Sequence, residues 1–190
     1  MEKLEKKLSE NKILSKHSII ELLDVWQKTK VLKAKESLIS LNQKDINLYF
    51  IKSGCVRLFV FDNEGNDKNL GFGYENTFIT SFQSFLENKP SLLSIEAVLE
   101  TEVYYISKND LMNLVVSNAE ITRWYQHMIE CTLSGHIQRQ VELLTLSPQE
   151  RYEVFKNRSG HLLNVIPLKL IASYLMMTPE TLSRIRAKIS

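Results

Sequence analysis

The residues with the clearest chemical potential lie on a short helix expected over residues 179–189. Glu180 and Arg184 are four residues apart there, one helical turn, so both fall on one face. A carboxylate can accept a hydrogen bond from the amino group of cytosine, and a guanidinium can bind O6 and N7 of guanine. An exposed salt bridge between the two side chains, worth about 0.3–0.5 kcal/mol, is the alternative interpretation.

A second short helix, expected over residues 168–176, precedes the first and is joined to it by a turn of a few residues. This spacing is typical of a helix-turn-helix. The apolar side chains that would hold the pair together recur at helical spacing. They are Leu168, Ile171, Ala172, Leu175, Leu182, Ile185 and Ile189.

Cations and hydroxyls around the same helices could hold phosphates, which fixes a position without reading a base sequence. The candidate nucleic-acid-binding residues are Lys169, Thr178, Glu180, Thr181, Ser183, Arg184, Arg186 and Lys188. Residues 147–190 carry 7 Lys and Arg against 3 Asp and Glu, whereas residues 1–146 carry 17 against 19. A basic C-terminal end suits a polyanion, although a solvated charged face would have the same composition.

Catalytic and metal-binding patterns are weak. His127 and Cys131 lie four residues apart and His136 is near, but two ligands make an incomplete metal site, so we expect no metal. No Ser-His-Asp, Cys-His, HExxH or P-loop pattern occurs, so we expect no enzyme and no cofactor. Cys55 and Cys131 lack CxxC spacing and are predicted to be reduced thiols.

The secondary-structure elements that must position these residues are indicated by the spacing of apolar residues, which changes from helical to strand-like after residue 29. Residues 1–29 are predicted to be helical, with Ser18 as an N-cap. Short strands typical of a small barrel or sandwich follow, with Gly54 at a bulge or tight bend and a turn over residues 62–66 in which Gly65 takes a positive φ. The expected strands are 31–34, 37–41, 48–52, 56–61, 69–72, 92–99 and 103–106.

Helical signals return at Ser107, and a long helix is expected over residues 118–146, about 40 Å at 1.5 Å per residue. Its apolar stripe favours a partner helix, because apolar surface would otherwise stay wet; packing along the chain's own barrel is the alternative. The candidate dimerisation residues are Ile121, Tyr125, Met128, Ile129, Leu133 and Ile137. Three short helices are expected after it, the first opened by a capping box at 147–150.

The bulk composition fits a folded protein. The 190 residues are 44% hydrophobic, which permits a sizeable core. No apolar run of about 18 residues occurs, and the first residues lack the apolar segment of a signal peptide. We therefore expect a cytoplasmic protein without a membrane span.

Several segments together resemble the Crp/Fnr family of regulators. They are 49–54, 62–65, 95–97, 103–107, 171–175 and 178–186. The resemblance implies an α+β fold with an N-terminal double-stranded β-helix, or jelly-roll, sensor barrel (1–117), a dimerisation helix (118–146) and a helix-turn-helix DNA-binding domain (147–190). It also implies a homodimer on double-stranded DNA, with RNA polymerase as a further partner. Glu180, Ser183 and Arg184 match the family's base-reading positions, for a TGA-like half-site.

The chain departs from the cyclic-nucleotide binders of that family. They carry a Gly-Glu-Leu segment that holds the ribose and an arginine that pairs with the phosphate, whereas here residues 78–82 and Ser91 occupy these places. Without that cation the burial of a phosphate has no offset, so we expect no dependence on cyclic nucleotides and leave the effector unknown. The candidate pocket residues are Phe78, Thr80, Ser81, Phe82, Ser91 and Leu92, although core packing is the better interpretation of the aromatic ones.

Two departures concern the C-terminal element. Met176 stands where the family has glycine, which costs about 1 kcal/mol at a positive φ or loosens the turn. The sequence stops at Ser190, so we expect the family's β-wing to be absent or reduced and DNA binding to be weaker and less salt-dependent. The rival hypothesis is a dimeric protein-interaction module whose barrel binds an unknown small ligand and which binds no specific DNA.

Overall fold

The computed structural model describes residues 1–10 and 12–189, and the chain divides into two compact units. The first unit consists of Met1–Val60 and Gly71–Ile129, and the second of Phe61–Leu70 and Glu130–Ser190. Within the described ranges, no helix is both long enough and apolar enough to cross a membrane.

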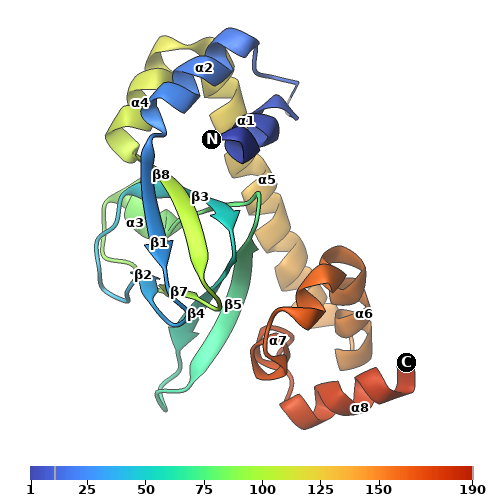
Figure 1. The fold of residues 1–190 in the computed structure, drawn as a ribbon. Helices are drawn as coiled ribbons and strands as arrows, with labels where there is room; N and C mark the ends of the chain where they lie inside the picture. The colour runs from blue at the N-terminus through green and yellow to red at the C-terminus, as the bar shows by residue number, and fades with distance from the viewer. Residues whose placement is uncertain (11, 190) are drawn as a thin grey trace. The chain divides into compact units, whose positions relative to one another are not determined.

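The strands form two four-stranded sheets (Figure 1). In the first sheet the order is β1 (Lys28–Leu32), β8 (Thr101–Ser107), β3 (Asn47–Ser53) and β6 (Phe78–Ile79). In the second sheet the order is β2 (Ser37–Ile39), β7 (Ser94–Ala97), β4 (Cys55–Phe61) and β5 (Asp67–Tyr74). β8 is antiparallel to both β1 and β3, with Tyr49 opposite Tyr105. The expected mixed α+β class is confirmed.

The apolar residues of this first unit form two cores, because side chains alternate between the two faces of a strand. One core draws on both sheets, with Ile51 and Val103 from the first sheet and Val56 and Ile95 from the second. The other core covers the outer face of the first sheet, where Phe50 and Tyr104 meet residues of several helices. The interior between the sheets is therefore filled by the chain's own side chains.

The N-terminal helices differ from the prediction. Residues 1–29 contain two helices, α1 (Glu2–Ser9) and α2 (Lys16–Val25), and β1 already begins at Lys28. The N-cap of α2 is Ser15, whose hydroxyl accepts a hydrogen bond from the Ser18 N–H, so the predicted cap at Ser18 is wrong. Ser18 is instead buried, and its hydroxyl donates to Glu120 at 2.7 Å, a contact 102 residues away that no local pattern reveals.

The strand boundaries needed smaller corrections. β1 starts three residues earlier than predicted, and only Ser94–Ala97 of the expected strand over 92–99 is regular. Two elements were missed, the two-residue β6 and the helix α3 (Phe82–Glu87). Helix α3 has no side-chain cap and no acidic residue in its first turn, so it lacks the local signals that mark a helix start.

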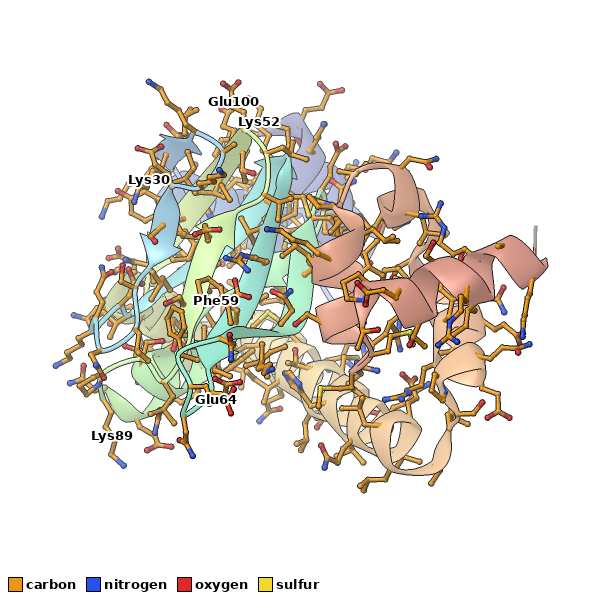
Figure 2. All side chains as sticks on the ribbon, turned by 90° about the horizontal axis from the view of Figure 1, so that it is seen from below. Lys30, Lys52, Phe59, Glu64, Lys89 and Glu100 are labelled. Atoms are coloured by element: carbon orange, nitrogen blue, oxygen red, sulfur yellow. The ribbon has the colours of Figure 1, made fainter. Side chains whose placement is uncertain are left out.

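Both predicted glycine turns are confirmed. Gly65 has φ 81° in the turn between β4 and β5, and Gly54 has φ 97° between β3 and β4. A Cβ on Gly54 would lie 2.4 Å from the Glu100 carbonyl oxygen, so only glycine fits this bend. Lys52 and Glu100, labelled in Figure 2, mark this end of the roll that the two sheets form.

The remaining elements are helices. Helix α4 (Lys108–Ser117) starts at the predicted cap Ser107, and the long α5 (Ala119–Thr145) matches the expected span of 118–146. Helix α6 (Pro148–Ser159) opens with the predicted capping box, in which Ser147 and Glu150 bond reciprocally. The short 3₁₀ helix η1 (Gly160–Asn164) was not predicted, and α7 (Leu168–Tyr174) and α8 (Pro179–Ile189) complete the second unit.

Candidate nucleic-acid interface

The turn between α7 and α8 is tight and closed by main-chain hydrogen bonds. The N–H of Met176 donates to the Ser173 carbonyl at 3.1 Å, and the N–H of Met177 donates to the Ala172 carbonyl at 3.0 Å. This pair of bonds is a Schellman motif, which requires a left-handed residue at the position of Met176. Met176 indeed has φ 54°, so the positive φ expected there is confirmed and the turn keeps regular geometry without glycine.

The start of α8 is capped by Thr178. Its hydroxyl accepts a hydrogen bond from the Thr181 N–H at 3.2 Å, satisfying one of the free N–H groups of the first turn. Leu182 is fully buried against the rest of the unit, where Ile171, Ala172 and Leu175 are also buried. The side chain of Ile189, expected in the same contact, lies outside the described residues. The apolar side of α8 is therefore anchored.

The opposite side of α8 faces solvent. Glu180, Ser183, Arg184 and Ala187 are all exposed. Hydrogen bonds from its own backbone N–H and from the Thr178 hydroxyl lower the pKa of Glu180, so its carboxylate is ionised at neutral pH and accepts hydrogen bonds only. Among the described residues no ion pair joins Glu180 to Arg184, whose guanidinium instead approaches the Thr181 hydroxyl at 3.4 Å.

The basic candidates lie on the same two helices of the second unit. Lys169 is exposed near the start of α7, Lys188 is exposed near the end of α8, and Arg186 is half-buried. Thr178 is exposed and Thr181 half-buried at the first turn of α8. The eight candidate residues thus lie on two adjoining helices and the turn between them.

A polar network around the buried Glu142, which the sequence analysis missed, joins α7 to α5 and α6. Glu142 is buried and lies 3.0 Å from the guanidinium of Arg158 and 3.7 Å from that of Arg139. Arg139 stacks on the ring of Tyr174 at 4.0 Å and donates to the Tyr174 carbonyl, while Arg158 donates to the Tyr174 hydroxyl at 3.1 Å. Burial lowers the pKa of Arg139, against the opposing effects of Tyr174 and Glu142. No local pattern predicts such a network, because its members come from three helices.

The candidate pocket residues do not converge on one site. Phe78 packs against Trp26, Phe50 and Trp124 in the core outside the first sheet. Leu92 is 65% exposed.

Ser81 and Ser91 do meet, with 2.7 Å between their hydroxyl oxygens, and Ser91 also donates to the Leu93 carbonyl at 2.7 Å. Thr80 donates to the Asn47 carbonyl at 2.8 Å, and Phe82 is half-buried at the start of α3. The buried hydroxyls of this region are thus satisfied within the chain.

The interior between the sheets is closely packed. A Cβ added to Gly73 would lie 2.7 Å from Ile79 and 2.8 Å from Ile51. The ring centroids of Tyr49 and Tyr105 lie 5.6 Å apart, and the Tyr49 hydroxyl donates a hydrogen bond to the Asp45 carboxylate at 2.8 Å. Burial, followed by the charge of Asp45, raises the pKa of Tyr49, so the phenol stays neutral.

The candidate dimerisation residues fall into two groups. Ile121 is fully buried in the chain's own core, with Tyr125 and Met128 packed beside it, so Ile121 is withdrawn from the set. Ile129 is half-buried. Further along α5 the apolar side chains are exposed, with Leu133 at 59% and Ile137 at 57%. Val141 and Leu144, at matching helical positions, are exposed as well.

The cysteines and histidines form no metal cluster in the part of the chain that the structure describes. His127, Cys131 and His136 are exposed on α5. Cys55 is buried, and burial raises the pKa of its thiol to about 12, so it remains a protonated core residue.

Comparison with known proteins finds a family match for the first part of the chain. Residues 29–118 match the family model of the cyclic nucleotide-binding domain. The chain is similar to FixK2 from Bradyrhizobium japonicum, with 20% identity, a TM-score of 0.75 and coverage of 85% of this chain and 83% of FixK2. No curated protein matches the sequence.

Two further solved structures extend the similarity over nearly the whole chain. CLP from Xanthomonas campestris, a c-di-GMP-responsive global regulator, has 16% identity, a TM-score of 0.67 and coverage of 92% and 91% of the two chains. The catabolite activator protein of Thermus thermophilus has 20% identity, a TM-score of 0.59 and coverage of 93% and 84%.

Residues 29–118, which include all the strands except the first residue of β1, are therefore similar to the cyclic nucleotide-binding domain. The chain as a whole is similar in fold to FixK2 and to the catabolite activator protein, in agreement with the resemblance found in the sequence.

Proposed function

We propose that this protein is a dimeric, sequence-specific DNA-binding transcription regulator of the Crp/Fnr type that acts in the cytoplasm without cyclic nucleotides. In this proposal residues 1–117 are the sensor, 118–146 the dimerisation helix and 147–190 the DNA-binding domain. The observation that carries it is the exposed pair Glu180 and Arg184 on a helix whose opposite side is anchored by the buried Leu182.

Helices α7 and α8 act as a helix-turn-helix, with α8 in the major groove. Arg184 binds O6 and N7 of a guanine, and Glu180 accepts from N4 of a cytosine, each good pair contributing about 1–3 kcal/mol of discrimination. Ser183 lies between them on the same exposed face and completes the reading set. Lys169 and Lys188 contact phosphates, which positions the helix but specifies no sequence.

The exposed apolar residues of α5 support a homodimer. Leu133, Ile137, Val141 and Leu144 are spaced by three or four residues, so they form one stripe. A stripe of this kind matches a second copy of itself across a two-fold axis. Two α8 helices related in this way would contact half-sites about one turn of DNA apart. At such promoters the bound dimer would contact RNA polymerase.

Independence from cyclic nucleotides is supported by the hydroxyl pair of Ser81 and Ser91. Ser91 stands where the cyclic-nucleotide binders carry a cation, and its oxygen is bonded to Ser81 and Leu93. A cyclic phosphate placed there would break these bonds and find no counter-charge. Beside Gly73 the side chains of Ile79 and Ile51 already fill the space that a Cβ would occupy.

The test is a gel-shift series on genomic fragments over a range of salt concentrations. We expect a sequence preference that Arg184→Ala abolishes and that Arg123→Ala, an exposed arginine of the first unit, leaves unchanged. Salt alone weakens both specific and non-specific binding, so the preference must be compared at each concentration. Absence of any preference in the unmodified protein would favour the protein-interaction module instead.

A further inference from the structure

A cluster of charged side chains lies in the second unit, where the last turns of α5 meet α6 and the end of α7 (Figure 1). The carboxylate of Glu142 lies 3.7 Å from the guanidinium of Arg139 and 3.0 Å from that of Arg158. Both guanidiniums also contact Tyr174, the first at its carbonyl and the second at its hydroxyl. Two cations therefore share one carboxylate.

Arg151 brings a third cation to the same place. It precedes Phe155 by four residues and Arg158 by seven, so the three residues lie on one face of α6. That face is directed toward α7, because the rings of Phe155 and Tyr174 pack 5.6 Å apart and Arg158 donates to the Tyr174 hydroxyl. Burial lowers the pKa of the Arg139 guanidinium, and the nearby charges of Arg158 and Arg151 lower it further. We call Arg139, Arg151 and Arg158 the arginine cluster.

In the described part of the chain the guanidinium of Arg151 makes no hydrogen bond or ion pair, although its Nε is buried. The nearest acids in α6 are engaged elsewhere, since Glu150 bonds reciprocally with Ser147, and Glu153 accepts from Gln149 at 3.1 Å. A buried donor without an acceptor lowers stability, so packing gives no reason for an arginine at this position. Its donors and its charge indicate an acceptor from outside the chain.

Positive charge exceeds negative charge at this place. Three guanidiniums accompany the single carboxylate of Glu142, which leaves two positive charges unbalanced. Guanidiniums do not lose their protons in proteins, so the excess persists at physiological pH. A phosphate monoester carries about −1.5 to −2 charge at neutral pH, which matches the excess, and arginines bind phosphate oxygens through paired N–H donors.

We propose that the arginine cluster binds the phosphate group of a small phosphorylated molecule. The side chain of Arg158 is 39% exposed, whereas those of Arg139 and Glu142 are only 13% and 8% exposed. A single phosphate group can reach such recessed donors, whereas the backbone of a DNA duplex contacts exposed side chains. The reading residues Glu180 and Arg184 lie on α8, outside the cluster, so the site goes beyond the proposed function and does not depend on it.

Isothermal titration calorimetry of the protein with inorganic phosphate, in chloride buffer of constant ionic strength, tests the site. We expect saturable binding that Arg151→Met weakens about tenfold, as for the loss of one hydrogen bond between charged groups. Methionine keeps an apolar stem and removes the donors and the charge. Lys156→Met, at an exposed position elsewhere on α6, is the matched control and should leave the affinity unchanged. Absence of saturable binding, or equal affinity of the two variants, overturns the proposal.

Two further measurements test other roles of Arg151. Without phosphate, the urea midpoint of Arg151→Met should be no lower than that of the unmodified protein, because the change removes an unpaired cation from the vicinity of two others. A lower midpoint would make Arg151 a structural residue and contradict the site. A DNA duplex of random sequence should not displace the bound phosphate. Displacement would assign the cluster to phosphates of the DNA backbone and overturn the binding of a small molecule.

Discussion

Glu180 and Arg184 lie one turn apart on the exposed face of α8, and no ion pair joins them in the described part of the chain. Glu180 is held ionised by the first turn of its own helix, and Arg184 approaches Thr181. An exposed salt bridge was the simpler alternative for this pair. Its absence leaves a carboxylate and a guanidinium side by side for partners outside the chain.

Dimerisation through α5 predicts that a charge in the stripe separates the subunits. Ile137→Asp should weaken the dimer at least tenfold by analytical ultracentrifugation, because an interface would have to bury an unpaired carboxylate. Ile20→Asp is the matched control, since Ile20 is equally exposed, at 56%, but lies on α2. A dimer that survives Ile137→Asp would contradict the role of this stripe.

A phosphate contact at Lys169 predicts a change in salt dependence. Lys169→Ala should weaken binding to all sequences alike and reduce the slope of log K against log salt by about 0.9. Fluorescence anisotropy over a salt series measures both quantities. Lys89→Ala should change neither: Lys89, labelled in Figure 2, is an exposed lysine of the first unit, and it pairs with Glu87. An unchanged slope in Lys169→Ala would remove Lys169 from the interface.

The network around Glu142 predicts that its removal lowers the stability of the second unit. Glu142→Ala leaves the mostly buried Arg139 without its carboxylate partner, which costs about 1–3 kcal/mol, whereas the exposed Arg158 contributes little. Urea unfolding of the intact protein should show this loss. Glu130→Ala, an exposed glutamate on the same helix, should change the free energy of unfolding by less than about 0.5 kcal/mol. Equal effects of the two changes would contradict the network's role.

Glu120 predicts an acid-dependent loss of stability. Hydrogen bonds from the Ser15 and Ser18 hydroxyls and the Ser15 N–H lower its pKa to about 2, against 4.5 for an ordinary glutamate. A lowered folded-state pKa stabilises the fold above pH 4.5, and this contribution is lost as the pH falls toward 2. Glu120→Gln should therefore reduce the urea midpoint at pH 7 and flatten its fall between pH 4.5 and 2. An unchanged pH profile would contradict the assignment.

The sequence predicted the elements that carry their own signals. Helix α5 was placed within one residue at each end by its apolar period, and α6 by the capping box of Ser147 and Glu150. Met176 was recognised as the residue forced to a positive φ, and its structure shows why the turn tolerates it: two main-chain bonds close around it.

Features that depend on distant parts of the chain escaped prediction. Ser18 and Glu120 meet across 102 residues, and Asn69 reaches Leu170 across 101. The Glu142 network requires three helices to be packed before its charges meet. The burial of Ile121 escaped prediction for the same reason. An apolar stripe on a helix does not reveal whether the chain's own core or a second copy of the chain covers it.

The central claim is tested most directly by the affinity of the unmodified protein and of Arg184→Ala for a selected site and for the same site with its contacted guanine replaced by adenine. The unmodified protein should prefer the original site by about 1–3 kcal/mol, and Arg184→Ala should bind both sites equally. If Arg184→Ala keeps the full preference for guanine, α8 does not read that base through Arg184, and the proposed mechanism of DNA recognition is wrong.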